Sequence, residues 1–139
     1  MEESCRDLMH QLSYYTLTLR DPEFIHQLVV DAYAAEHGDE KARPMKLTFA
    51  LVGLYLVNER GYTGKQVQET HMALAKRSRT WPSFPLPAGR DWLTVQDVVR
   101  APDAEKQAMI RKWSASVWEV WRPQEAVISG LLAQYLDFR

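Results

Sequence analysis

Four histidines are the residues of this chain best suited to chemistry, because an imidazole can bind a metal ion, transfer a proton or hold an anion. At 100° per residue, His71 shares one face of a predicted helix with the apolar residues Val67 and Leu74, so it points towards the core. His10 falls among polar residues on the solvent side of its helix. His71 is therefore a candidate general base or metal ligand, although a core histidine held by a hydrogen bond would have the same placement.

Two further histidines lie on one predicted helix. His26, Tyr33 and His37 line one edge of its apolar face, and Asp31 lies at the other edge. His26 and His37 are separated by about 16 Å along a helix, so one zinc ion cannot bind both. Either His26 or His37, but not both, could join His71 from another helix, and the pair His26 and His71 is taken as the candidate site for a divalent transition metal. Asp31 is either a ligand-binding residue or a structural acceptor for a tryptophan N–H or an arginine.

The basic residues are concentrated in one part of the chain. Residues 60–90 hold six Lys or Arg against one Glu, whereas residues 1–59 hold five against ten acidic residues. This charge could attract a small anion, a nucleic acid or an acidic partner, or it could only complement a helix dipole. If the protein is an enzyme, Arg77 or Arg79 is the expected anion clamp, with His71 or His26 as general base or metal ligand. Nucleic-acid domains are usually basic overall, and a net charge of −1 disfavours that class.

Helices must position these residues, and hydrophobic spacing and capping signals predict helices over nearly the whole chain. The expected helices cover about residues 3–19, 22–37, 45–60, 63–78, 94–101, 103–122 and 124–136. Three prolines between Trp81 and Pro87 exclude a helix there and separate the fourth and fifth helices. We therefore expect an all-α fold, with residues 1–139 forming a single compact bundle of about six or seven helices.

Length and composition limit the class of protein. A chain of 139 residues with 46% apolar and 25% charged residues is typical of one globular domain. The longest apolar stretch, residues 47–57, is shorter than the roughly 20 residues that span a membrane. The first residues lack the pattern of a signal peptide, and the single cysteine, Cys5, cannot form an internal disulfide. We expect a soluble, cytoplasmic protein without a membrane partner.

The pattern His26-x3-Val30-Asp31-Ala32-Tyr33-x3-His37 resembles a bacterial family of short helical proteins that is known only as a domain of unknown function. Looser likenesses extend the resemblance over about residues 5–125, at Leu51-x2-Leu54-x-Leu56, Glu59-Arg60-Gly61, Trp81-Pro82 and Ser116-Val117-Trp118-Glu119. The resemblance implies a helical fold and draws attention to His26, Asp31, Tyr33 and His37, but it implies no reaction. Many members of the family carry further N-terminal cysteines that suggest metal binding, whereas Cys5 alone is present here.

Two classes of function fit these observations. The first is a helical domain with a His-lined polar pocket that binds a metal ion or a small anionic ligand. Its candidate ligand-binding residues are His26, Asp31, Tyr33, His37, His71, Arg77 and Arg79. The second is a non-enzymatic protein–protein interaction module, which uses the Pro-rich loop to hold a partner or a second copy of the chain. Because no known catalytic motif is complete, the sequence does not decide whether the protein is an enzyme.

Overall fold

The computed structural model describes residues 4–38 and 42–138. The helices are α1 (Cys5–Thr18), α2 (His26–Glu36), α3 (Pro44–Arg60), α4 (Gly64–Arg77), α5 (Val95–Arg100), α6 (Asp103–Trp121) and α7 (Glu125–Leu136), with a short 3-10 helix, η1 (Arg122–Gln124). No strand occurs in these two ranges. The all-α fold predicted from the sequence is therefore confirmed.

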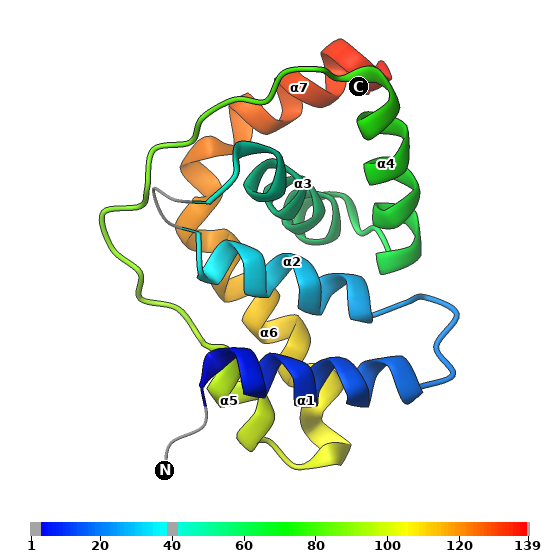
Figure 1. The fold of residues 1–139 in the computed structure, drawn as a ribbon, viewed down its shortest axis with the longest axis vertical. Coiled ribbons are helices and arrows are strands. Elements are labelled where there is room, and N and C mark those ends of the chain that lie inside the picture. Colours follow the sequence, from blue (N-terminus) through cyan, green and yellow to red (C-terminus); the bar gives the residue numbers. More distant parts are fainter. Residues whose placement is uncertain (1–3, 39–41, 139) are drawn as a thin grey trace.

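Helix α3 lies at the centre of the molecule. It packs against α2, α4, α6 and α7, which surround it in Figure 1. This position follows from its sequence, because apolar side chains cover nearly its whole circumference and residues 50–56 are all buried. Pro44 occupies the first turn of α3, and Gly61 ends the helix in the left-handed conformation with φ of 68°. Helices α1 and α5 pack together at one end of the molecule, where α1 also contacts α2.

Helix α6 joins the bundle through three buried tryptophans, Trp113, Trp118 and Trp121. Each indole N–H has an acceptor on another helix. Trp113 donates to Glu36 of α2 (2.8 Å), and Trp118 donates to Glu59 of α3 (2.9 Å). The N–H of Trp121 reaches the main-chain oxygen of Ala35 (3.2 Å). Since a buried indole needs both apolar contact and a partner for its N–H, these bonds fix α6 against α2 and α3.

Helix α2 begins later than the sequence predicts. With Asp21 as N-cap, the helix was expected to start at Pro22, but it starts at His26. The carboxylate of Asp21 instead accepts the N–H groups of Glu23 (2.9 Å) and Ile25 (2.7 Å), which closes a turn before the helix. Aspartate side chains form such local bonds to the backbone readily, and here the turn competes successfully with the helix.

This turn is held against the start of α4. Phe24 has a φ of 58°, which is unusual for a bulky residue. A Cβ on Gly64 would lie 1.9 Å from the main-chain oxygen of Phe24, so only glycine allows this close approach. The N–H of Lys65 also donates to the main-chain oxygen of Glu23 (2.9 Å). The unfavourable conformation of Phe24 is therefore maintained by contacts with α4.

The Pro-rich segment, residues 81–87, has no helix, as predicted. After α4 the chain passes along α7 and then runs to α5, as the green trace without helix in Figure 1 shows. Phe84 is buried, and the half-buried ring of Trp81 meets the ring of Phe49 edge-on at 5.2 Å. Leu86 remains 41% exposed. The segment thus covers part of the core with two of its three large apolar side chains.

Helices α2 and α3 approach closely at Asp31 and Gly53. A Cβ on Gly53 would lie 1.9 Å from Oδ2 of Asp31 and 3.2 Å from Cγ1 of Val67. Asp31 is only 4% exposed, and Gln27 donates to its Oδ1 (3.2 Å). Glycine inside a helix costs about 1 kcal/mol relative to alanine. A glycine is therefore needed at position 53 because any side chain there would overlap the carboxyl group of Asp31.

We predict that Gly53→Ala lowers the free energy of unfolding by about 1–3 kcal/mol, because the new methyl group overlaps Asp31. The loss should be smaller when Asp31→Ala is also present, since the overlapping carboxyl group is then absent. Gly130→Ala is the matched control, because a Cβ on Gly130 meets nothing within 4 Å. Urea unfolding of the four variants gives the values. An equal cost of Gly53→Ala in both backgrounds would contradict this explanation.

Candidate functional site

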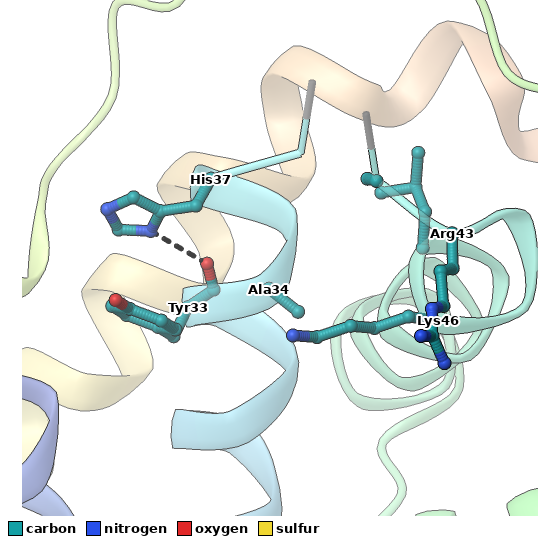
Figure 2. Close-up of a pocket in the computed structure, with 7 residues that line it drawn as sticks. Tyr33, Ala34, His37, Arg43 and Lys46 are labelled. Carbon is teal, nitrogen blue, oxygen red and sulfur yellow. Dashed lines mark hydrogen bonds between the residues drawn. The ribbon is translucent and has the colours of Figure 1, made fainter. Parts of the chain in front are cut away.

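A pocket of about 270 Å³ lies where α2 ends and α3 begins. Its lining residues are Tyr33, Ala34, His37, Ala42, Arg43, Lys46 and Leu47. Figure 2 shows the rings of Tyr33 and His37 on one side, Lys46 and Arg43 on the other, and Ala34 between them. Both rings project from the side of α2 away from Lys46 and Arg43, whereas the small side chain of Ala34 faces these two cations.

The ring of His37 is held by a hydrogen bond at Nδ1 and has a carboxylate oxygen near Nε2. Nδ1 lies 2.9 Å from the main-chain oxygen of Tyr33, and because a carbonyl oxygen only accepts, Nδ1 carries a proton. Nε2 lies 3.3 Å from Oε2 of Glu36. The ring also packs against that of Tyr33, with the centroids 4.2 Å apart. Tyr33 and His37 therefore form a packed pair near the end of α2.

Glu36 contacts His37 at the end of α2, and the sequence analysis missed it. Its side chain is buried, and Oε1 accepts the N–H of Val95 (2.9 Å) and the indole N–H of Trp113 (2.8 Å). Burial raises the pKa of Glu36, although His37 and these two donors oppose the shift. One signal could have found it: Glu36 lies on the same helix face as Val29 and Ala32, which places an acidic residue on the apolar face of the helix.

The side of the pocket that α3 forms is positively charged. Arg43 and Lys46 are both exposed, and neither forms an ion pair with another of the residues that the structure describes. They lie at the N-terminal end of α3, whose first turn contains no acidic residue. The free N–H groups at a helix N-terminus also attract negative charge. This side of the pocket is therefore suited to an anion.

His71 lies in the core rather than at this pocket. Its Nε2 is 2.7 Å from the main-chain oxygen of Phe49, and its ring stacks on the Phe49 ring at 4.9 Å. Burial lowers the pKa of His71 to about 4, although the bond to Phe49 opposes the shift. His71 is therefore neutral at pH 7 and donates its Nε2 proton to α3. This is the arrangement of a core histidine held by a hydrogen bond.

His26 and Asp31 are also held by structural contacts. Nδ1 of His26 lies 2.9 Å from the hydroxyl oxygen of Thr16 on α1, and burial lowers the pKa of His26. Asp31 accepts from Gln27 on its own helix, not from a tryptophan or an arginine as one hypothesis held. Burial raises the pKa of Asp31 well above its usual value, and the bond from Gln27 opposes the shift only in part.

The metal hypothesis gains no support from these placements. His26 contacts α1, whereas His71 contacts α3. Within residues 4–38 and 42–138, no group of three or more His, Cys, Asp or Glu side chains is arranged to hold a metal ion. A zinc site normally takes at least three protein ligands. His26 and His71 are therefore held by separate structural contacts.

The predicted anion clamp also lies elsewhere. The guanidinium group of Arg77 donates to the main-chain oxygen of Tyr135 near the end of α7 (3.1 Å). Arg79 is exposed after α4 and does not line the pocket between α2 and α3. Of the seven candidate ligand-binding residues, the structure brings Tyr33 and His37 to this pocket and places the other five outside its lining.

Fold and site together define a small all-helical protein with an aromatic and cationic pocket between two helix ends. The chain belongs to DUF5946, a family of unknown function, whose family model matches residues 1–122. This confirms the resemblance to a family of unknown function, and the match includes α1 to α6. No curated protein and no solved structure matches the chain. In the part of the chain that is described, no helix has the length and apolar character needed to cross a membrane.

The burial of His71 predicts that acid destabilises the protein. A histidine whose pKa is lowered in the folded state contributes stability above pH 6.5, and this contribution is lost as the pH falls towards 4. We expect His71 to account for a loss of about 2–3 kcal/mol in the free energy of unfolding between about pH 7.5 and 4.5. In His71→Gln the part of this pH dependence that comes from His71 should disappear, because glutamine can still donate to Phe49 but does not titrate.

Urea unfolding at the two pH values measures this difference. His10→Gln is the matched control, because His10 is exposed on α1 and should leave the pH dependence unchanged. Some acid sensitivity should remain in His71→Gln, since burial also lowers the pKa of His26. The same loss of stability in wild type and His71→Gln would show that His71 is not the titrating group.

Proposed function

We propose that this protein binds a small oxyanion, such as a phosphate, sulfate or carboxylate group, in the pocket between α2 and α3. The observation that carries the proposal is the pair of exposed cations, Arg43 and Lys46, on one wall of this pocket and at the positive end of α3. Arginine binds oxyanions through paired N–H donors, and lysine adds a mobile positive charge.

The size and walls of the pocket limit the ligand. A volume of about 270 Å³ is just below the usual range for small-molecule sites, so it favours a small ligand or one charged group of a larger one. On the α2 side the lining is made by Tyr33, Ala34 and His37, and the two rings are tilted at 36° to each other and project away from the cations. The contacts that favour a ligand here are therefore those of Arg43 and Lys46 with its anionic group.

The alternative, a protein-interaction module built on the Pro-rich segment, has less support. Trp81 and Phe84 are the side chains of that segment best suited to anchor a partner, but Phe84 is buried and Trp81 packs on Phe49. A metal-binding function lacks a cluster of ligands among the described residues. Oxyanion binding therefore remains the function that this geometry favours.

Charge removal at the pocket tests the proposal. We expect Arg43→Gln and Lys46→Gln each to weaken sulfate binding by roughly tenfold, because each removes a charge-assisted contact. Calorimetric titration at one fixed ionic strength measures the affinities. Arg79→Gln is the control, since it removes the same charge from an exposed residue outside the pocket. An equal effect of Arg79→Gln, or no sulfate binding by the wild type, would refute binding at this site.

A further inference from the structure

A second pocket lies at the end of the molecule where α1 is beside α5 and the start of α6. Its volume is about 350 Å³, and it is lined by residues of α1 between Gln11 and Thr18, by Val99 of α5, and by Asp103 and Lys106 of α6. None of these residues lines the pocket between α2 and α3. The volume falls within the range of sites that hold small molecules.

Much of the lining is apolar. Leu12 belongs to the buried core, and the half-buried Val99 packs against that core. Tyr14 also lines the pocket, and it is 74% exposed. The pocket therefore joins core side chains to an aromatic side chain in contact with water. A ligand with an apolar body that covers Leu12, Tyr14 and Val99 would remove this surface from water.

The two hydroxyl groups of Tyr15 and Thr18 have already used their protons. The hydroxyl of Tyr15 donates to the main-chain oxygen of Asp103 (3.3 Å), which also links α1 to α6. The hydroxyl of Thr18 donates to the main-chain oxygen of Tyr15 (2.8 Å). Since a hydroxyl group has one proton, a hydrogen-bond donor for a ligand must come from another residue of the lining.

Lys106 supplies this donor. Its side chain is only 13% exposed, and its ammonium group donates to the main-chain oxygen of Ala101 and to Oδ1 of Asp103 (3.0 Å). An ammonium group has three N–H donors, and the third has no acceptor among the residues that the structure describes. It is left for water or for a ligand. Because a largely buried donor needs a partner, an acceptor that a ligand brings into the pocket would be favourable.

The charge of Lys106 is balanced within the pocket. Asp103 is the other charged residue of the lining, and its exposed carboxylate contacts the ammonium group. An anionic group on a ligand at Lys106 would also be close to Asp103, and like charges repel each other. The acceptor that suits this pocket is therefore uncharged, such as a carbonyl oxygen.

We propose that this pocket is a second binding site, for a small uncharged molecule with an aromatic or apolar body and one carbonyl oxygen. The carbonyl oxygen accepts a hydrogen bond from Lys106, and the body covers Leu12, Tyr14 and Val99. Lys106 selects a carbonyl compound over a hydrocarbon, and Asp103 selects against an anion. The proposal does not rest on oxyanion binding, because the two pockets share no lining residue.

Probes of similar shape test this selection. The first is acetophenone. In α-methylstyrene a CH₂ group replaces the carbonyl oxygen, and benzoate carries a negative charge. We expect acetophenone to bind to this pocket roughly tenfold more tightly than either of the others, because it alone offers a neutral acceptor to Lys106. Amide chemical-shift titrations of the full chain give the affinities. The shifts with acetophenone should lie at residues 11–18, 99 and 103–106 and not at residues 43–47.

Lys106→Met keeps an apolar side chain of similar length but removes the donor. It should lower the affinity for acetophenone to that for α-methylstyrene and leave the affinity for α-methylstyrene unchanged. Lys112→Met is the matched control, because Lys112 is exposed on the same helix and does not line the pocket. If Lys106→Met does not fold, Tyr14→Ala serves, since Tyr14 is exposed. It should weaken the binding of both neutral probes severalfold, whereas Leu17→Ala, at an exposed position outside the lining, should not.

The outcomes decide the proposal. If acetophenone and α-methylstyrene bind with equal affinity, Lys106 does not select a carbonyl compound and the proposal fails. It also fails if the shifts with acetophenone do not saturate or lie mainly outside this pocket. Sedimentation of the chain gives a third outcome: a dimer that Tyr14→Ala dissociates would show that a second copy covers the pocket, which overturns the proposal. Sulfate binding at residues 43–47 is measured separately, so either proposal can fail while the other stands.

Discussion

The arrangement of the site depends on the hydrogen bonds that the buried carboxylate of Glu36 accepts. This carboxylate joins the C-terminal turn of α2 to Val95 of α5 and to Trp113 of α6, and it contacts His37 with its second oxygen. Burying a carboxylate is costly unless donors compensate it, and here two N–H groups do so on one oxygen. The neighbouring oxygen of Ala35 accepts the indole of Trp121, which fixes the same turn a second time.

The second wall of the site depends on the central helix. Because α3 is apolar on nearly all sides, the other helices pack around it and its N-terminal turn emerges beside the end of α2. The contact of Gly53 with Asp31 sets how closely the two helices approach. The lining residues Tyr33, Ala34 and His37 thus come from the end of α2, and the cations Arg43 and Lys46 come from the start of α3.

Local signals in the sequence predicted most of the helices. Gly61 and the Thr63 capping box lie where α3 ends and α4 begins, since capping depends on residues a few positions apart. The predicted start of α2 was wrong because contacts with α4 support the turn at Asp21, and no local sequence pattern reveals those contacts. Likewise, Tyr33 and His37 were singled out from one helix face, whereas Arg43 and Lys46 join them only through the packing of α3 on α2.

Amide chemical-shift mapping of a sulfate titration tests the central claim, oxyanion binding at this pocket, most directly. The account predicts shifts concentrated at His37 and at residues 43–47, where α2 ends and α3 begins, with residues 76–79 after α4 unchanged. Shifts concentrated at residues 76–79, or none that saturate with sulfate, would contradict it.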